Sequence, residues 1–448
     1  MVKGCKYIGL ISLIGLMSWG CAGKRAGQDM EREGTTFARY FAVVEHDTVA
    51  DGETFHFQEL RIYNPWEADK PVLRRYYLVN LNDNDNHNNN HNNNHNDPST
   101  NSGTRQENDN QNKNQNDNDP STSSGQKNRS EEVKEKRSKD NTFNENYHLN
   151  DFPLPGDGIV VRVPVRRVAT GSCTHVGFIH ALDATEALCG VTDKHLVFTP
   201  LPETVQNLGD CMSPDVERFV AAQPEVVFMS TYSTNDAATT RLEKAGLTVV
   251  PVMEWVENDP VGRAEWIRFF GALLGKEELA DSLFEATAEH YEQLKEQVAE
   301  SGLAYSKSIL SGGSFRGTWY VPSGATYMGR LFHDAGASYA YASDSTNGSL
   351  PLSIEQVLQQ FKDADVWVGA PAKTLQELEE IDSKHTWFKA FQDSTVYTFN
   401  SRTTPTGGND FWEGGVTEPD RILEDLIFVL YPETLTEDFS PKYLKKLR

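Results

Sequence analysis

Hydrophobic and polar positions alternate differently along successive parts of this chain. Between residues 37 and 79, short runs rich in β-branched and aromatic residues, such as RYFAVVEH and PVLRRYYLV, are separated by the turn sequences ADGE and EADKP. This pattern predicts short strands. From residue 82 to about residue 150, Asn, Asp, Ser, Lys and Glu dominate and aliphatic residues are almost absent. Such a segment buries too little apolar surface to offset its chain entropy, so we expect disorder.

Strand character returns directly after the polar segment, in GIVVRVPVRRVATGS. This strand and the strand before the segment would pair as a β-hairpin whose loop has grown long, and long polar insertions at loop tips cost little stability. The segment contains NDNDNHNNNHNNNHND, in which His87, His91 and His95 are four residues apart. On a helix they would share one face and form a metal site. Their Asn-rich setting disfavours helix, so we expect only adventitious metal binding.

Beyond residue 165, apolar strand patterns alternate with helical ones. PEVVFMS and LTVVPV are typical of buried strands, whereas SPDVERFVAAQ and TNDAATTRLEKAG are typical of helices, and this alternation implies a mainly parallel sheet. A long helical pattern covers residues 260 to about 300, where Gly271 and Gly275 can bend or break it. A second alternating series follows. We therefore predict an α/β fold in which two α/β lobes with mainly parallel sheets are joined by a long backbone helix and preceded by a small β-hairpin region.

The first residues of the chain have the pattern of a secretion signal. Lys3 and Lys6 precede YIGLISLIGLMSWG, an apolar run that suits a signal peptide better than a membrane span. The run ends at Cys21 and resembles a bacterial lipoprotein signal in which Cys21 is lipidated, although Ser18 stands where such signals usually carry Leu. Cleavage nearby without lipidation, or an anchor that is never cut, are the alternatives.

These patterns divide the chain into six segments. We expect a signal peptide with its lipidation site, an N-terminal β-strand segment, a low-complexity disordered insertion, an N-terminal α/β lobe, a linking helix and a C-terminal α/β lobe, at residues 1–21, 22–81, 82–150, 151–259, 260–301 and 302–448.

Charge and motifs exclude several classes of function. A net charge of −23 argues against nucleic acid and against an anionic lipid surface as partners. GxxxxGK[ST], GxSxG and HExxH are all missing from the sequence, so nothing points to a familiar active site. Outside the leader, Cys173, Cys189 and Cys211 allow at most one disulfide, and their spacing fits no zinc motif, so we expect ordinary core residues.

Several segments resemble one known family. RVPVRRVATGSCTHVGFIHALDATEALCGVTD resembles the first βαβ unit, and DVERFVAAQPEVVFMS and SIEQVLQQFKDADVWV resemble the matching helix–strand segments of the two lobes, in the substrate-binding proteins of iron–siderophore, haem and cobalamin ABC importers. GTWYVPSGATYMGRLFHDAGASYAY and GGNDFWEGGVTEPDRILEDLIFVLYPE resemble cleft and terminal segments of its iron-uptake branch. The resemblance implies a monomeric, lipid-anchored, periplasm-facing protein with no cofactor of its own and no catalysis. Its expected ligand is a ferric siderophore, with haem or cobalamin as alternatives.

The resemblance also implies how the protein meets its transporter. In this family one glutamate on each lobe docks into arginine pockets of the membrane permease, which works with its ATPase. The matching positions are Glu217 in VERFV and Glu355 in IEQVL. Two carboxylates on separate lobes can report whether the cleft is closed, and carboxylate–arginine pairing is oriented. Taken without the resemblance, both are ordinary exposed helix glutamates.

Ligand contacts are expected among aromatic residues and arginines that follow strands. Each aromatic residue has core packing as its alternative, and each arginine has pairing with surface acids. A histidine at a helix start is either an axial ligand to haem or cobalt or a polar residue near the helix cap. We expect Trp266 and Trp387 to be core residues. The candidate ligand contacts are His175, Tyr232, Trp255, Arg316, Trp319, Tyr320, Arg402 and Trp412.

No group of metal-binding side chains in the two lobes has convincing ligand spacing, so the sequence favours a chelated metal over a bare ion. One alternative is an enzyme of the chelatase type that removes metal from a tetrapyrrole, with His175 or His333 as acid or base. Another is a surface adhesin with a polar tail.

Overall fold

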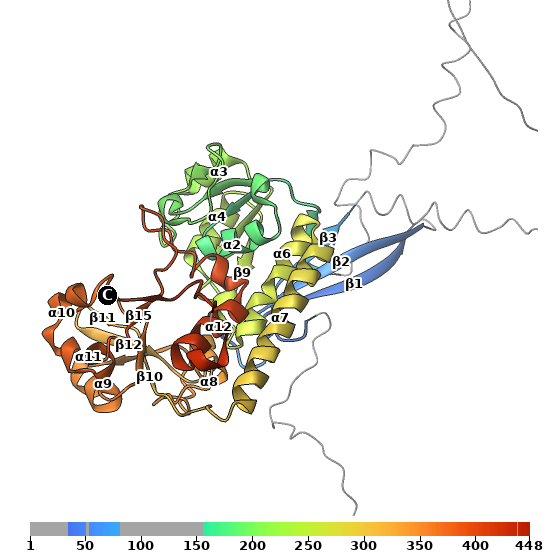
Figure 1. Ribbon diagram of the computed structural model, residues 1–448. Coiled ribbons are helices and arrows are strands. Elements are labelled where there is room, and N and C mark those ends of the chain that lie inside the picture. The colour runs from blue at the N-terminus through green and yellow to red at the C-terminus, as the bar shows by residue number, and fades with distance from the viewer. Residues whose placement is uncertain (1–34, 51–52, 81–155, 437) are drawn as a thin grey trace, which may run out of the picture. The chain divides into compact units, whose positions relative to one another are not determined.

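The computed structural model describes residues 35–50, 53–80, 156–436 and 438–448 (Figure 1). The predicted signal peptide, its Cys21 and the His-rich run of the predicted insertion lie outside these residues. Among the described residues, no helix is both long enough and apolar enough to cross a membrane.

The described part of the chain begins with a four-stranded sheet of strand order β1-β2-β3-β4, at the right of Figure 1. Its strands are β1 (Phe41–Ala50), β2 (Glu53–Tyr63), β3 (Val72–Val79) and β4 (Ile159–Arg162). β1 and β2, and β2 and β3, pair antiparallel. β3 and β4 pair in parallel, however, so the hairpin predicted between them is wrong. Parallel neighbours require a crossover connection, because the chain must return to the starting end of the sheet.

Two buried carboxylates bind the described start of the chain to the linker region. Glu265 is fully buried and accepts hydrogen bonds from the successive backbone N–H groups of residues 36–38, at 2.6 to 2.8 Å. Glu257, also buried, accepts from the N–H groups of residues 39–40 and from the indole of Trp266, at 2.8 to 3.1 Å. Five successive backbone donors therefore depend on two side chains that lie more than two hundred positions later.

The N-terminal lobe contains a parallel sheet of order β7-β6-β5-β8-β9. Its three central strands are wholly buried, which explains their unbroken apolar sequences. The strands are β5 (Val168–Thr170), β6 (Leu188–Val191), β7 (Gln206–Asn207), β8 (Val226–Ser230) and β9 (Val249–Val252), with the helices α2 (Cys173–Ala181), α3 (Val216–Ala222) and α4 (Ala237–Lys244). Short 3-10 helices are η2 (Thr185–Ala187), η3 (Lys194–Leu196) and η4 (Glu254–Val256).

The linker consists of three helices, α5 (Pro260–Ala264), α6 (Trp266–Leu274) and α7 (Glu277–Glu300). Asp259 caps α5, and α6 ends at Gly275, whose positive φ of 65° suits a glycine C-cap. A Cβ atom on Gly271 would lie 2.7 Å from that of Ala280, so glycine permits the close packing of α6 on α7. The break anticipated at Gly275 is therefore real, and α7 forms the long helix.

The C-terminal lobe combines parallel and antiparallel pairs. One parallel pair consists of β10 (Ile309–Ser311) and β14 (Val366–Val368). An antiparallel sheet consists of β11 (Ser314–Phe315), β12 (Thr318–Pro322) and β13 (Ser349–Leu352). A second antiparallel pair consists of β15 (Tyr397–Thr398) and β16 (Lys445–Lys446). Its α-helices are α8 (Tyr327–Asp334), α9 (Ile354–Phe361), α10 (Leu375–Ile381), α11 (Lys389–Gln392) and α12 (Pro419–Leu430). The 3-10 helices are η5 (Ser383–Trp387), η6 (Gly414–Val416) and η7 (Pro432–Thr434).

The linker and the last helix hold this arrangement together. α12 packs on α7 and also contacts α8 and α5, and η6 packs on α2 of the N-terminal lobe (Figure 1). One continuous hydrophobic core includes residues of both lobes and of the linker. The predicted α/β class with a mainly parallel sheet is confirmed, and the N-terminal lobe shows it most clearly.

Candidate functional site

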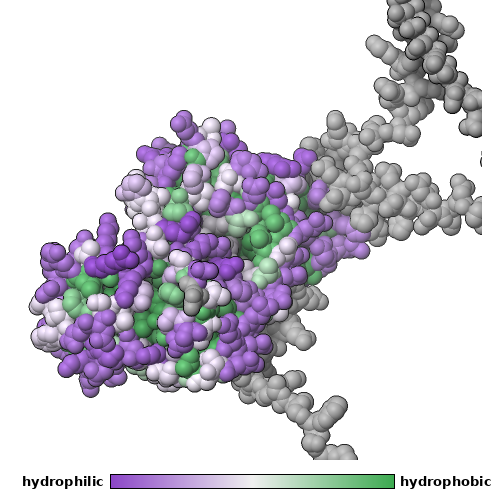
Figure 2. Space-filling view, in the orientation of Figure 1, coloured by the Kyte–Doolittle hydropathy of each residue, from purple (hydrophilic) through white to green (hydrophobic). Residues whose placement is uncertain are grey.

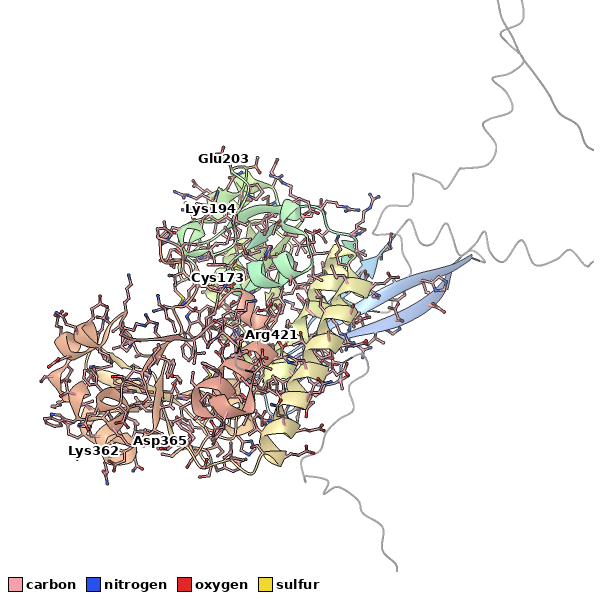
Figure 3. All side chains as sticks on the ribbon, in the orientation of Figure 1. Cys173, Lys194, Glu203, Lys362, Asp365 and Arg421 are labelled. Atoms are coloured by element: carbon pink, nitrogen blue, oxygen red, sulfur yellow. The ribbon has the colours of Figure 1, made fainter. Side chains whose placement is uncertain are left out.

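The carboxyl ends of the parallel strands collect polar and aromatic side chains at one edge of the N-terminal lobe. Cys173 begins α2 just after β5, Tyr232 follows β8, and Glu254 and Trp255 follow β9. Because parallel strands end at a common edge, residues far apart in the sequence become neighbours there. Figure 3 labels Cys173 at this edge of the lobe.

Tyr232 and Trp255 form an exposed aromatic pair. Their ring centroids are 5.1 Å apart with an interplanar angle of 38°. The exposed fractions are 52% for Tyr232 and 37% for Trp255, so the pair presents ring surface to solvent rather than to the core. Of the predicted ligand contacts, these two are brought together by the structure. Partial burial raises the pKa of Tyr232, and the neighbouring acidic groups of Cys211 and Glu254 raise it further.

A partly buried row of interacting side chains lies beside the aromatic pair. Glu254 accepts a hydrogen bond from the Thr174 hydroxyl at 2.8 Å through Oε1, and the same oxygen is 4.0 Å from the Arg263 guanidinium. Arg263, in α5, stacks on the ring of Tyr327 in α8 at 4.6 Å. These contacts lead from the N-terminal lobe through the linker to the C-terminal lobe. Burial raises the pKa of Glu254, and Arg263 opposes that shift.

Two buried atoms in this row of side chains, Glu254 Oε2 and Arg263 Nε, have no hydrogen-bond partner among the described residues. Glu254, Arg263 and Tyr327 are not among the ligand contacts predicted from the sequence. The local signal was present in EWVENDPVGR, where three acids and an arginine flank the predicted helix start at Pro260. Their meeting with Tyr327 depends on the tertiary fold.

The C-terminal lobe contributes an exposed turn between β11 and β12. Arg316 and Gly317 both have positive φ, 53° and 84°, and form the two-residue turn between β11 and β12. Phe315 and Tyr320 are exposed, and the Arg316 guanidinium lies 5.1 Å from the centre of the Phe315 ring. Among the described residues Arg316 has no ion pair. Arg316 and Tyr320 are thus accessible, as their prediction requires.

Trp319, two residues from the same turn, is a core residue. Only 1% of it is exposed, and its ring packs on Trp367, His385 and Phe388. Its indole N–H donates to the carbonyl of Ser311 at 3.0 Å. The expectation that Trp319 is exposed is wrong, because alternation along β12 turns it inward while Tyr320 turns outward.

His175 is likewise unavailable to a ligand. It is fully buried within α2, where its Nε2 lies 3.3 Å from the Ser230 hydroxyl and its Nδ1 has no partner among the described residues. Burial lowers the pKa of His175 to about 3, so the ring is neutral. An axial-ligand role is therefore wrong for this conformation. Trp266 is fully buried, as predicted. Trp387 is 53% exposed, so the prediction that it is a core residue is wrong.

The segment before α12 crosses from the C-terminal lobe to the N-terminal lobe. The buried Glu413 carboxylate accepts hydrogen bonds from the backbone N–H groups of Phe198 and Thr199 at 2.6 and 2.7 Å. A Cβ atom on Gly177 would lie 2.0 Å from the Glu413 carbonyl oxygen, so glycine is required for this approach. Trp412, next to this contact, is 46% exposed. The lobes are therefore joined by this contact as well as by the linker.

Arg402 lies in a different place from the aromatic pair. It pairs with Asp410 at 2.7 Å, stacks on Phe198 at 5.2 Å, and lines a pocket of about 520 Å³ together with Ile267 and Leu283. Figure 2 shows hydrophobic surface over α6 and α7, which form one wall of this pocket. No other predicted ligand contact lines it. The eight predicted contacts thus do not form one continuous site.

The predicted docking glutamates are both exposed in the first turn of a helix. Glu217 lies in α3, which Asp215 caps, and Glu355 lies in α9, which Ser353 and Gln356 cap through a capping box. Glu355 forms an exposed ion pair with Lys384 at 3.0 Å, and this hydrogen bond lowers the pKa of Glu355.

The described cysteines are all free. Cys189 is buried and its thiol contacts the Val168 carbonyl at 3.1 Å, as expected of a core residue. Cys173 and Cys211 are only partly buried, contrary to that expectation. Burial raises the pKa of each of these two thiols to about 11, so both are protonated at neutral pH. In the described part of the chain, no cluster of three or more His, Cys, Asp and Glu side chains is arranged to hold a metal ion.

Comparison with known proteins gives the family. A family model described as periplasmic binding protein matches residues 168–403, more than half of the chain. An uncharacterized lipoprotein of Methanocaldococcus jannaschii is 24% identical over 321 residues, which cover 66% of this chain and 74% of that protein.

Solved structures with similar folds include two named binding proteins. One is the triscatecholate siderophore binding protein of Bacillus subtilis, with 17% identity, a TM-score of 0.48, and coverage of 62% of this chain and 96% of that one. The other is a periplasmic haem binding protein of Pseudomonas aeruginosa, with 17% identity, a TM-score of 0.49, and coverage of 63% and 98%. The family match extends from the first strand of the parallel sheet to beyond β15, and so includes most of both lobes. This chain belongs to the periplasmic binding protein family.

Proposed function

We propose that this protein is the lipid-anchored substrate-binding component of an ABC importer and that it captures a metal chelate between its two lobes. The observation that carries the proposal is the exposed pair of Tyr232 and Trp255 at the carboxyl edge of a parallel sheet. Exposed aromatic surface at such an edge suits a ligand with a flat or apolar face. A ferric siderophore is the ligand that we propose, and haem and cobalamin are alternatives that also present a flat or apolar face.

The partly buried row of contacts from Thr174 to Tyr327 supports capture between the lobes. It contains side chains of the N-terminal lobe, the linker and the C-terminal lobe, so a ligand that displaces one member changes the packing of all three. The helical linker and the Glu413 contact both restrict the relative motion of the lobes. We therefore expect a small closure on ligand binding, in contrast to the wide closure that flexible strand hinges permit.

Delivery to the permease is proposed for Glu217 and Glu355. Each carboxylate lies in the first turn of a capped helix, on a different lobe, and each is exposed. A permease that presents an arginine to each would sense the distance between the lobes. The Lys384 partner of Glu355 is itself exposed, and such exposed pairs exchange readily for another cation.

The proposal is tested by offering the purified protein metal-loaded chelates and analysing what is returned. Quenching of tryptophan fluorescence measures binding, and mass spectrometry of the chelate released by denaturation measures its integrity. A binding protein returns the chelate unchanged. Recovery of a demetallated product would instead show an enzyme, although its candidate base His175 is buried and neutral.

A further inference from the structure

The charges around the aromatic pair indicate which kind of chelate the site accepts. Acidic groups lie near the pair. Asp236 caps α4 four residues after Tyr232, the exposed Asp210 directly precedes Cys211, and the buried Glu254 directly precedes Trp255. Cys211, whose thiol is protonated, adds a polar but neutral group. The rim formed by the N-terminal lobe therefore has acidic rather than basic character.

Three arginines near the junction of the lobes are already paired with carboxylates, so they present little free positive charge to a ligand. Arg263 lies 4.0 Å from Glu254, Arg330 of α8 lies 3.7 Å from Asp259, and Arg402 pairs with Asp410. Two arginines are among the predicted ligand contacts. Arg402 is paired, whereas Arg316, on the exposed β11–β12 turn, forms no ion pair within the described part of the chain. A polyanion placed on the aromatic pair would therefore meet the nearby acidic groups, while these three junction arginines are already paired.

We propose that the chelate bound by this protein is neutral or positively charged, and that it places an apolar or unsaturated face on Tyr232 and Trp255. This inference rests on the proposed function and narrows its ligand class. A ferric trihydroxamate, which is neutral or carries an ammonium group, satisfies the requirement. A ferric tris(catecholate), which carries three negative charges, does not, because like charges placed together at an interface disfavour binding.

Glu254 is the residue through which this selectivity can be altered. It is 1% exposed and its Oε2 has no partner among the described residues, so its charge is only partly compensated by Arg263. Replacing the carboxyl group by an amide of equal size, Glu254→Gln, removes the negative charge of the ionised carboxylate next to Trp255. The hydrogen bond from Thr174 retains an acceptor in the amide oxygen.

The experiment compares three probes by fluorescence titration of the full chain. They are ferrioxamine B, a cationic trihydroxamate, ferrichrome, a neutral trihydroxamate, and ferric enterobactin, an anionic tris(catecholate). We expect at least one trihydroxamate to bind with a Kd at least about tenfold below that of the tris(catecholate). Glu254→Gln should reduce this ratio severalfold, whereas the exposed Glu186→Gln should leave it unchanged.

Salt dependence gives a test that needs no variant. Affinity for the cationic chelate should fall as salt rises, because salt screens its attraction to the acidic rim. Equal or tighter binding of the tris(catecholate) would overturn the charge inference and leave the proposed function standing. Failure of all three chelates to bind, together with failure of haem and cobalamin to bind in the same titration, would contradict the proposed function itself.

Discussion

Glu265 offers the sharpest test of how the chain is held together, through the variant Glu265→Ala. The carboxylate accepts three backbone N–H groups of residues 36–38 and pairs with Arg268 at 3.1 Å. Alanine leaves these donors without an acceptor, and an unsatisfied buried donor costs about 1–3 kcal/mol. Thr36 is exposed, so water can replace the acceptor there and two donors carry most of the loss. Arg268 keeps Asp281 as its second partner, at 2.7 Å.

The expected loss is about 3–5 kcal/mol in the free energy of unfolding. Urea denaturation followed by circular dichroism at 25 °C measures it. Glu296→Ala, an exposed glutamate of α7, is the control and should lie within about 0.5 kcal/mol of the natural protein. Glu265→Gln, which keeps one oxygen acceptor, should lie between the two. A loss below about 1 kcal/mol for Glu265→Ala would refute the view that this carboxylate anchors the start of the fold.

Three further predictions concern docking, pH and the inserted segment. Glu217→Ala combined with Glu355→Ala should abolish uptake and leave the chelate Kd unchanged, and normal uptake would remove the docking assignment. Burial raises the pKa of Glu257 to about 8, so the folded state holds a proton that the unfolded state loses above about pH 4.5. Stability should therefore fall as pH rises from about 5 to 8, and Glu257→Gln should flatten this slope in urea titrations at several pH values; an identical slope in the variant would contradict the reasoning. Deleting residues 82–150 leaves ten residues, 80, 81 and 151–158, between β3 and β4. Ten residues are long enough to connect two parallel strands, so the free energy of unfolding and the chelate Kd should both be unchanged. Loss of affinity would show that the segment takes part in binding.

The α/β lobes were predictable because their strands and helices have strong local patterns. Strands buried on both faces give continuous apolar runs, as in VVFMS and VVPV, and the helices between them are capped by Asp215 and Asp236. The parallel pairing of β3 with β4 was not predictable, because the alternation along a strand is the same for a parallel and an antiparallel partner.

The candidate site was predictable only in part. Tyr232 and Trp255 follow strands, and a position after a strand in a parallel sheet determines the edge at which a side chain lies. Burial of His175 and Trp319 and exposure of Trp387 depend on neighbours far away in the sequence, which local patterns do not contain. For the same reason the chain of Thr174, Glu254, Arg263 and Tyr327 became visible only in the folded protein.

The central claim, capture of a chelate on the exposed aromatic pair, is tested most directly by one titration. The chelate that binds tightest in the three-probe comparison is titrated into the natural protein, into Tyr232→Ala combined with Trp255→Ala, and into Trp387→Ala. Isothermal calorimetry serves here because it does not rely on the tryptophans being replaced. Each of the two rings contributes about 1 kcal/mol or more of contact with a flat ligand, so the double variant should weaken binding at least about tenfold. Trp387 is equally exposed but lies in η5, away from the strand edge, and its loss should leave the Kd unchanged. Undiminished affinity in the double variant would contradict the account.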